Sequence, residues 1–190
     1  MKRSSGEHHR HTAKILLTPG RIQRRVRGLA DTISRDYAGK KLTLVAVLKG
    51  SVIFFADLVR HLTINCSVDF ISVASYEGSR SRGVVRLLTD LRDSPAGKDL
   101  LLVEDIVDSG YTLAYLQKNL STRQPASLKT CVLLDKVAAR KIPVKIDYRA
   151  FAIPDEFVVG YGLDYREEYR GLPYIGVLRP EIIRKKEQGN

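Results

Sequence analysis

Short apolar runs recur along the sequence and alternate with segments whose apolar residues are spaced as on one face of a helix. The run LTLVAVL, residues 42–48, is apolar throughout, which is typical of a strand covered on both faces. Further strands are predicted at residues 69–76, 84–91, 99–106 and 128–136, and helices at 18–38, 51–62 and 109–123. Strands that alternate with helices in this way predict an α/β fold with a mainly parallel, twisted sheet flanked by helices.

The pattern changes after Arg140. Three short segments, KIDYRAFAIP, EFVVGYGLDY and YIGVLRPEI, are rich in aromatic and β-branched residues and are separated by Pro and Gly. They predict a small antiparallel region packed near the main sheet. Residues 1–14 are basic and rich in histidine, and we expect them to form a disordered tail. A length of 190 residues suits one core, so residues 15–190 are expected to form a single domain.

Composition narrows the functional classes. The apolar runs are far shorter than the roughly 20 residues of a membrane-spanning helix, and the N-terminus lacks the apolar stretch of a secretory signal. Cys66 and Cys131 are far apart and fit buried free thiols, so we expect a cytoplasmic protein. The formal net charge of +11 is compatible with a nucleic-acid partner, an anionic substrate or a solvated basic surface.

One stretch of this basic chain is acidic. In LLLVEDIVDSGYTL, residues 100–113, a predicted buried strand runs into a helix through Glu104, Asp105 and Asp108, with no cation among them. Ligands bind outside the carboxyl ends of the strands in an open parallel sheet. One alternative is an ordinary strand end, with solvated acids and a helix cap at Asp108 or Ser109.

The residues after the acids are suited to a phosphate group. Backbone N–H groups at the helix start near Gly110, together with the helix dipole, attract a phosphate monoester. Ser109 and Thr112 add hydroxyl donors. Glu104 and Asp105 would repel that phosphate, so they suit the vicinal hydroxyls of a sugar or a magnesium ion bound to them. The pattern therefore indicates a phosphorylated sugar as the ligand.

The segment VEDIVDSGYT resembles the phosphoribosyl pyrophosphate signature of the type I phosphoribosyltransferases. From about Ile15 to Ile182 the chain resembles the bacterial hypoxanthine (hypoxanthine-guanine) phosphoribosyltransferases. Besides the signature, the motifs are VAVLKGSVIFFADLVR, SVASYEGS, LLDK and IPDEFVVGYGLDYREEYRGLPYIGVLRPE. The resemblance implies the type I phosphoribosyltransferase fold, with a small hood subdomain formed by the N-terminal segment and the residues after about 140.

The resemblance also implies an activity in purine salvage. A 5-phosphoribosyl group would pass from its pyrophosphate to N9 of hypoxanthine, guanine or both, giving IMP or GMP and pyrophosphate, with Mg²⁺ as cofactor. Glu104 and Asp105 correspond to the acids that contact the ribose hydroxyls and a magnesium ion. Asp108 corresponds to the general base or acid near N7 of the purine. Carboxylates near the ribose would stabilise the positive charge that develops as pyrophosphate leaves.

The remaining roles follow from the same resemblance, residue by residue. The 5′-phosphate loop is implied at Ser109, Gly110, Tyr111 and Thr112, with only a backbone contact at Tyr111. Lys49 and Gly50 match the pyrophosphate loop, with a cis peptide bond before the lysine. Asp164 matches the acid that holds a second magnesium ion, and Arg170 matches an arginine that contacts pyrophosphate.

A flexible loop and a purine pocket complete the implied site. Ser75 and Tyr76 match a loop that closes over the site and excludes water, and we expect Arg80 and Arg82 beyond them to be solvated. The purine-binding residues are expected to be Lys136, Phe157 and Val158: the lysine donates to the 6-oxo group, the phenyl ring stacks on the base, and the valine backbone reads the base edge.

Rival interpretations remain. The fold also includes regulators that bind nucleic acid, for which the basic composition would be useful. The presence of every catalytic motif favours an enzyme instead, so a nucleic-acid partner is not expected. A transferase that prefers guanine or xanthine is a closer rival, because the motifs barely distinguish these bases. The family usually forms dimers or tetramers, so we expect a homo-oligomer; the basic segment RIQRRVRG has no role that the sequence explains.

Overall fold

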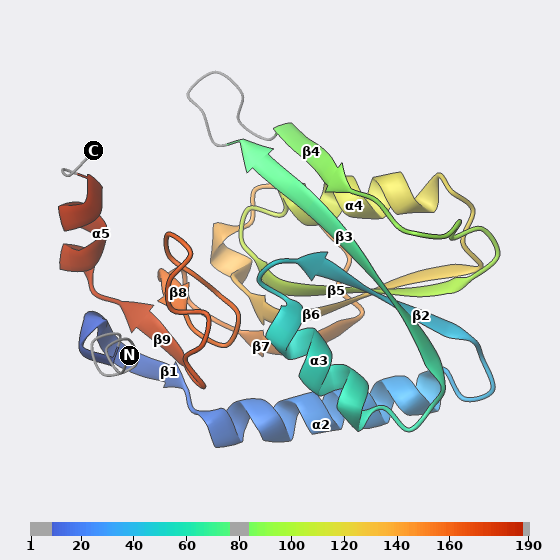
Figure 1. Ribbon diagram of the computed structural model, residues 1–190, viewed down its shortest axis with the longest axis horizontal. Coiled ribbons are helices and arrows are strands. Elements are labelled where there is room, and N and C mark those ends of the chain that lie inside the picture. Colours follow the sequence, from blue (N-terminus) through green and yellow to red (C-terminus); the bar gives the residue numbers. More distant parts are fainter. Residues whose placement is uncertain (1–8, 77–83, 188–190) are drawn as a thin grey trace.

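The computed structural model describes residues 9–76 and 84–187, which form two sheets with flanking helices (Figure 1). In chain order the elements are β1 (Thr12–Leu17), α2 (Pro19–Asp36), β2 (Leu42–Leu48), α3 (Val52–His61), β3 (Cys66–Tyr76), β4 (Val84–Thr89), β5 (Asp99–Val107), α4 (Tyr111–Ser121), β6 (Ser127–Asp135), the 3-10 turn η1 (Val137–Ala139), β7 (Tyr148–Ala152), β8 (Val158–Val159), β9 (Ile175–Leu178) and α5 (Pro180–Glu187). The larger sheet has the order β4-β3-β2-β5-β6-β7. Its neighbouring strands are parallel except for β3 and β4, which confirms the predicted α/β fold with a mainly parallel sheet.

Helix α2 illustrates how local sequence sets an element. Thr18 caps it by accepting a hydrogen bond from the backbone N–H of Arg21, and Pro19 stands at the first helical position, where its missing N–H costs nothing. Ile22 and Val26 recur on one face of the helix and are fully buried. The helix predicted at residues 18–38 is therefore found, one or two residues shorter at each end.

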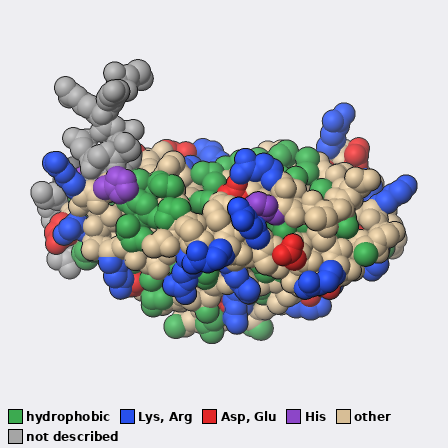
Figure 2. Space-filling view, turned by 90° about the horizontal axis from the view of Figure 1, so that it is seen from below, with side chains coloured by type: hydrophobic (Ala, Val, Ile, Leu, Met, Phe, Trp, Pro, Cys, Tyr) green, Lys and Arg blue, Asp and Glu red, His purple; other side chains and the backbone are tan. Residues whose placement is uncertain are grey.

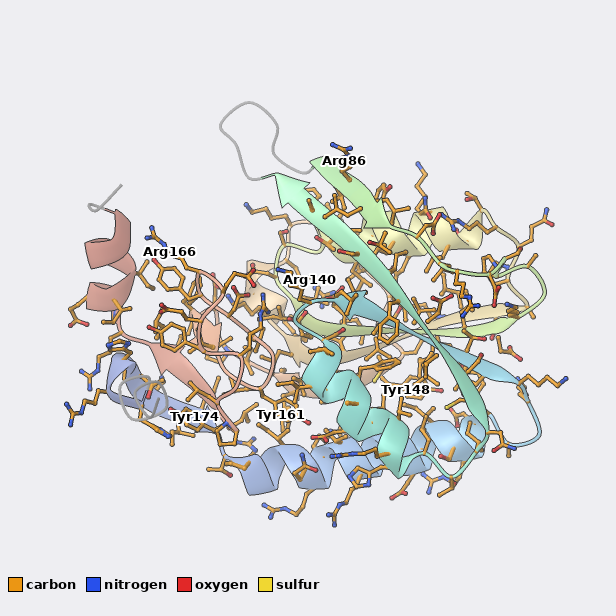
Figure 3. All side chains as sticks on the ribbon, in the orientation of Figure 1. Arg86, Arg140, Tyr148, Tyr161, Arg166 and Tyr174 are labelled. Carbon is orange, nitrogen blue, oxygen red and sulfur yellow. The ribbon has the colours of Figure 1, made fainter. Side chains whose placement is uncertain are left out.

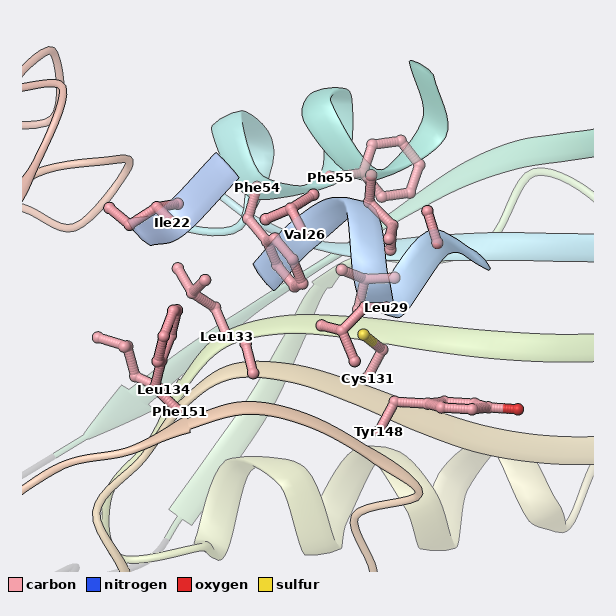
Figure 4. Packing of buried hydrophobic residues seen from close by; sticks show 14 of the residues in the cluster. Ile22, Val26, Leu29, Phe54, Phe55, Cys131, Leu133, Leu134, Tyr148 and Phe151 are labelled. Carbon is pink, nitrogen blue, oxygen red and sulfur yellow. The ribbon is translucent and has the colours of Figure 1, made fainter. Parts of the chain in front are cut away.

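The main sheet has a layer of helices on each face. Along β2, Leu44 and Ala46 join the core under α2 and α3, whereas Val45 and Val47 join the core under α4. In Figure 4 the apolar side chains of α2 and α3 lie over Cys131 and neighbouring residues of β6 and β7. Because both faces of the central strands are covered, these strands are apolar throughout, which is the pattern in the sequence.

The smaller sheet has the antiparallel order β1-β9-β8. Residues 9–14, which we expected to belong to a disordered tail, are ordered in the structure. Thr12 pairs with Leu178 in β9, and His9 stacks on Tyr174 with its Nδ1 2.8 Å from the tyrosine hydroxyl oxygen. The prediction for this part of the tail was wrong, because β1 is held by partners more than 160 residues away; residues 1–8 lie outside the described part of the chain.

The segment KIDYRAFAIP is a second correction. We expected it in the small antiparallel region, but its β7 pairs in parallel with β6 at the edge of the main sheet. Tyr148, Ala150 and Phe151 are buried against the α2 and α3 side of the core, so packing places the strand there. The other two segments contribute β8 and β9 to the smaller sheet, which we call the hood together with the loops between them.

Lysine and arginine side chains are spread over the face that carries α2, among hydrophobic and other groups (Figure 2). Arg24 and Arg27 are exposed there, and Arg25 donates hydrogen bonds to the carbonyls of Arg149 and Ala150. Within the described ranges, no helix has both the length and the apolar character that a membrane crossing requires.

Candidate active site

A cavity of about 460 Å³ lies at the carboxyl ends of β2 and β5. These two strands are neighbours, but β2 continues through α3 to β3 on one side, whereas β5 continues through α4 to β6 on the other. Such a divergence leaves a crevice at the edge of an open α/β sheet, where ligands bind. The loop between β8 and β9 in the hood closes the cavity on a further side with Asp164, Glu167 and Arg170.

Most of the predicted site residues meet in this cavity. Its walls include Lys49, Gly50, Glu104, Asp105, Asp108, Ser109, Gly110, Tyr111, Thr112, Asp164 and Arg170. The predicted purine-binding residues Lys136, Phe157 and Val158 and the flexible-loop pair Ser75 and Tyr76 are not among the described residues that line it. The structure thus assembles the sugar and phosphate side of the predicted site in one place.

Glu104 and Asp105 are the buried acids of the cavity. Glu104 lies near the carboxyl end of β5 and is only 6% exposed, and its Oε2 atom is buried without a hydrogen-bond partner in the described part of the chain. Burial raises the pKa of Glu104 well above its usual range, and the adjacent charge of Asp105 raises it further. Burial also raises the pKa of Asp105, although Arg170 and hydrogen bonds act in the opposite direction.

The loop after β2 packs directly on Asp105. The Leu48–Lys49 peptide bond is cis, as the resemblance implied. A Cβ atom added at Gly50 would lie 1.7 Å from Oδ2 of Asp105, so only glycine fits at this position. On its other side, a Cβ at Gly162 in the hood would lie 2.1 Å from the carbonyl oxygen of Gly50. The loop is thus held between the Asp105 carboxylate on one side and the backbone of the hood at Gly162 on the other.

The segment from Asp108 to Gly110 turns the chain from β5 into α4. Gly110 is the residue that precedes the helix, and its φ of +92° is a backbone conformation that favours glycine. The carbonyl of Ser109 accepts hydrogen bonds from the N–H groups of Lys141 and Ile142, which anchors the turn to the next loop. Residues 110–113, at the start of α4, line the cavity, and the N–H groups of a helix's first turn are the groups that bind a phosphate.

Lys136 connects the cavity to the predicted purine side. Its Nζ lies 2.8 Å from Oδ2 of Asp108 and 3.3 Å from Oδ1 of Asp155, and its side chain is 8% exposed. Phe157 is 42% exposed and packs edge-on against Tyr165, with ring centroids 5.4 Å apart. Phe157 is not among the described residues that line the cavity, whereas Lys136 reaches the cavity residue Asp108 through their ion pair. The predicted roles of Lys136 and Phe157 toward a base stay predictions.

The described backbone includes two residues of the predicted flexible loop, and it places them in a strand. Ser75 and Tyr76 are the last residues of β3 and pair with Val85 and Val84 of β4. The following segment EGSRSRG, with Arg80 and Arg82, lies outside the described residues.

Glu167 is a site residue that sequence reasoning missed. Its Oε2 lies 3.1 Å from Lys49 Nζ, and its Oε1 lies 3.4 Å from Nη2 of Arg170. Arg170 also contacts Oδ1 of Asp164 at 2.9 Å and donates to the carbonyl of Gly162 at 2.7 Å. The sequence offered one signal: the charged run REEYR, which follows the motif residue Asp164 and ends at the motif residue Arg170. No periodicity in that run distinguishes Glu167 from its neighbours as a site residue.

The donor set suits the magnesium that we expected at Glu104, Asp105 and Asp164. Carboxylate oxygens are the hard ligands that Mg²⁺ prefers, and the unpartnered Oε2 of buried Glu104 is free to accept such a contact. The described residues contain no cluster of three or more acidic, His or Cys side chains placed to hold a metal alone. The residues therefore fit an ion that is completed by substrate oxygens, as is usual for magnesium bound with phosphates.

The raised pKa of Glu104 predicts a stability that depends on pH. Because the folded protein binds this proton more tightly than the unfolded chain, the carboxyl lowers stability progressively as the pH rises above 4.5 toward the folded-state pKa. A Glu104→Gln variant removes this cost, so its melting temperature in magnesium-free buffer should exceed that of the wild type more at pH 8 than at pH 5. Thermal unfolding at several pH values measures the difference, and Glu181→Gln, on exposed α5, is the control. An equal difference at every pH would contradict a raised pKa.

The sequence and the structure are both similar to those of known phosphoribosyltransferases. The family model of the phosphoribosyl transferase domain matches residues 12–166. A hypoxanthine-guanine phosphoribosyltransferase of Mycobacterium avium is 48% identical over 178 residues, covering 90% of this chain and 88% of that protein. The crystal structure of a hypoxanthine phosphoribosyltransferase from Staphylococcus aureus superposes with a TM-score of 0.90 at 43% identity, covering 96% of this chain and 98% of that one. The chain also matches the bifunctional protein TilS/HprT of Listeria innocua at 43% identity, but spans only 27% of its length.

The fold, the cavity at the sheet edge and the family match together define the class: the chain belongs to the phosphoribosyltransferase family. Its curated relatives of near equal length are named hypoxanthine-guanine phosphoribosyltransferases, at 43% to 48% identity. The family that the sequence motifs indicated is therefore confirmed.

Proposed function

We propose that the protein transfers a 5-phosphoribosyl group from phosphoribosyl pyrophosphate to N9 of hypoxanthine or guanine, releasing pyrophosphate, and so acts in purine salvage. The observation that carries the proposal is that acids and cations line one cavity. Glu104 and Asp105, which we call the acidic floor, come from β5, while Lys49 and Arg170 come from two loops and pair there with Glu167 and Asp164. A ribose that becomes cationic suits the acids, and a pyrophosphate suits the cations.

The residues divide the work of the reaction between them. The first turn of α4 and the hydroxyl of Thr112 bind the 5′-phosphate and so fix the ribose over the acids. Glu104 and Asp105 orient the ribose hydroxyls and stabilise the developing oxocarbenium charge. These acids and Asp164 would hold magnesium, which would supply positive charge to the pyrophosphate. The C1′ bond to pyrophosphate oxygen breaks, and a bond from C1′ to N9 forms.

Recognition of the base is assigned to Lys136 and its partners. A lysine ammonium has three N–H donors, of which Asp108 and Asp155 take two. The third N–H donor remains for the 6-oxo group of the base, which accepts a hydrogen bond. The amino group at C6 of adenine could not accept it in the same way. Asp108 accepts or returns the proton at N7, while Phe157 and the backbone of Val158 bind the plane and the edge of the ring.

Exposed apolar side chains on β3 bear on the oligomeric state of the protein. Val68 and Phe70, two residues apart on β3 and so on one face of the strand, are 49% and 39% exposed. Apolar groups gathered in this way favour burial against another copy, so we propose a homodimer or homotetramer of cytoplasmic enzyme.

Nucleotide formation from phosphoribosyl pyrophosphate and Mg²⁺ tests the function, with hypoxanthine, guanine, xanthine and adenine assayed separately. Turnover is expected with hypoxanthine or guanine and little with adenine, and chelation of magnesium should abolish it. An Asp108→Asn variant should lose on the order of 100-fold in kcat, because it cannot exchange a proton with N7. Asp93→Asn, a change of the same chemistry at an exposed site distant from the cavity, should keep full activity.

Two outcomes would change the assignment. A preference for xanthine would retain the reaction and replace the substrate. If phosphoribosyl pyrophosphate binds but no base reacts, the transferase is excluded, and a regulator that binds nucleic acid on the same fold becomes the hypothesis to test.

A further inference from the structure

The carboxylate of Glu167 bridges two cations of the cavity. One of its oxygens pairs with Lys49 at 3.1 Å, and the other pairs with Arg170 at 3.4 Å. Both cations belong to the side of the cavity that is assigned to pyrophosphate in the proposed function, on which this inference rests. One side chain of the protein therefore occupies the position between them that an anionic ligand oxygen would take.

Arg170 does not need Glu167 for its orientation. Its Nη1 donates to the carbonyl of Gly162 at 2.7 Å, and its Nη2 contacts Asp164 at 2.9 Å. Asp164 is in turn held by the backbone N–H of Glu167, at 2.9 Å from its Oδ2, and this bond does not depend on the Glu167 side chain. The guanidinium is thus already fixed, and the carboxylate of Glu167 adds charge to the site but little order.

The local charges cancel. Lys49 and Arg170 carry two positive charges, and Asp164 and Glu167 carry two negative ones, with the hydrogen bond from Lys49 holding the pKa of Glu167 below its usual value. A pyrophosphate that approaches this neutral cluster gains less than it would from two unpaired cations. The side chain of Glu167 is 65% exposed and that of Asp164 only 29%, so Glu167 is the acid that can turn away into water.

We propose that Glu167 competes with pyrophosphate for Lys49 and Arg170 and thereby limits the affinity of the site for both phosphoribosyl pyrophosphate and the pyrophosphate product. A solvated ion pair is easily broken, so the substrate can displace the carboxylate. When pyrophosphate leaves, the Glu167 carboxylate pairs again with Lys49 and Arg170 in place of the pyrophosphate oxygens. Glu167 thus lowers the affinity of the site for the leaving group without contacting the base.

Binding of inorganic pyrophosphate with Mg²⁺, measured by calorimetry on the full chain, tests the proposal. Glu167→Gln keeps the shape of the side chain and the backbone bond to Asp164 but removes the negative charge. It should bind pyrophosphate about fivefold more tightly than the wild type and lower the KM for phosphoribosyl pyrophosphate by a similar factor. The KM for hypoxanthine should not change. In a Lys49→Met background the same substitution should gain less, because one of the two contested cations is gone.

A matched control and two clear contradictions complete the test. Glu181→Gln makes the same chemical change on α5, away from the cavity, and separates a local effect from the change in net charge. Equal or weaker pyrophosphate binding by Glu167→Gln, in a protein that still forms nucleotide, would overturn the competition and leave the proposed function intact. Failure of the wild type to bind pyrophosphate or to turn over any base would overturn the proposed function itself.

Discussion

Replacing Gly50 with alanine should abolish most of the transferase activity while the protein stays folded. The new Cβ would meet Oδ2 of Asp105 at 1.7 Å, a separation at which one of the two groups must move. The atoms that the new Cβ meets all belong to the Asp105 carboxylate, and Gly162 of the hood blocks retreat of the Gly50 backbone. The carboxylate is therefore the group that turns away from its place in the cavity. Displacement of a catalytic group by about 1 Å can cost on the order of 100-fold, and we expect at least that loss in kcat/KM for phosphoribosyl pyrophosphate.

Gly28→Ala is the matched control, because it makes the same change in the exposed interior of α2, where the added Cβ meets nothing within 4 Å. Alanine is favoured over glycine inside a helix by roughly 0.5–1 kcal/mol, so this variant should melt slightly higher with unchanged activity. A Gly50→Ala enzyme that keeps its kcat/KM within a few-fold of the wild type would show that the position of Asp105 is not critical.

Removal of the Asp57 carboxylate should destabilise the protein by roughly 2–4 kcal/mol. Asp57, on α3, is 8% exposed and accepts hydrogen bonds from Tyr161 at 2.6 Å and Gln23 at 2.5 Å, with Arg60 as a further partner. Figure 3 shows Tyr161 reaching from the hood toward the helices α2 and α3. Asp57→Ala leaves the buried hydroxyl and amide unpaired, and urea unfolding should report the loss as a lower midpoint.

The pH dependence of this loss follows from the charge of Asp57. Burial raises its pKa, but the hydrogen bonds from Tyr161 and Gln23 and the charge of Arg60 outweigh this and leave it below the ordinary value of 3.8. The stabilisation is therefore present above pH 4 and disappears as the pH falls through the folded-state pKa, so wild type and Asp57→Ala should converge in acid.

Tyr161→Phe removes the hydroxyl that donates to Asp57 but keeps the charge of Asp57, so it measures the contribution of this one hydrogen bond. It leaves Asp57 with two partners and should cost only about 1 kcal/mol. Tyr161 precedes Gly162, whose carbonyl accepts from Arg170, so a looser hood should raise the KM for phosphoribosyl pyrophosphate more than that for the base. If Asp57→Ala unfolds at the same urea concentration as the wild type, the hood is not anchored through this cluster.

The parts of the fold and site that could be predicted share one property: their signals are local. The covered strands of the main sheet are apolar throughout. The segment from Glu104 to Thr112 carries its acids, glycine and hydroxyl groups close together in the sequence. Because the strand register of β2 and β5 brings their carboxyl ends together, Lys49 and Gly50 then fall beside the acids. Local pattern predicted the acids and the turn into the helix, whereas Lys49 and Gly50 were assigned to the site only through the resemblance to the family.

The parts that escaped prediction depend on distant contacts or on backbone conformation. Three of the six residues of β1 are solvent-exposed in a row, so its sequence lacks the alternation of a half-buried strand, and pairing with β9 holds it in place. The place of Glu167 depends on two consecutive left-handed residues, Arg166 and Glu167, at φ of +54° and +64°. Neither is glycine or asparagine, so nothing in the sequence marks the turn that directs this carboxylate to Lys49.

The pairing of β1 with β9 also has a consequence for synthesis of the chain. Thr12 is made early and its partner Leu178 late, so the hood cannot close on a ribosome until almost the whole domain has emerged. The main sheet from β2 to β7 is complete before that, with its acidic floor already in place. Asp164 and Arg170, carried between β8 and β9, arrive last. Within this domain, Glu104 and Asp105 are therefore made before Asp164 and Arg170, the two hood residues that the proposed function assigns to magnesium and pyrophosphate.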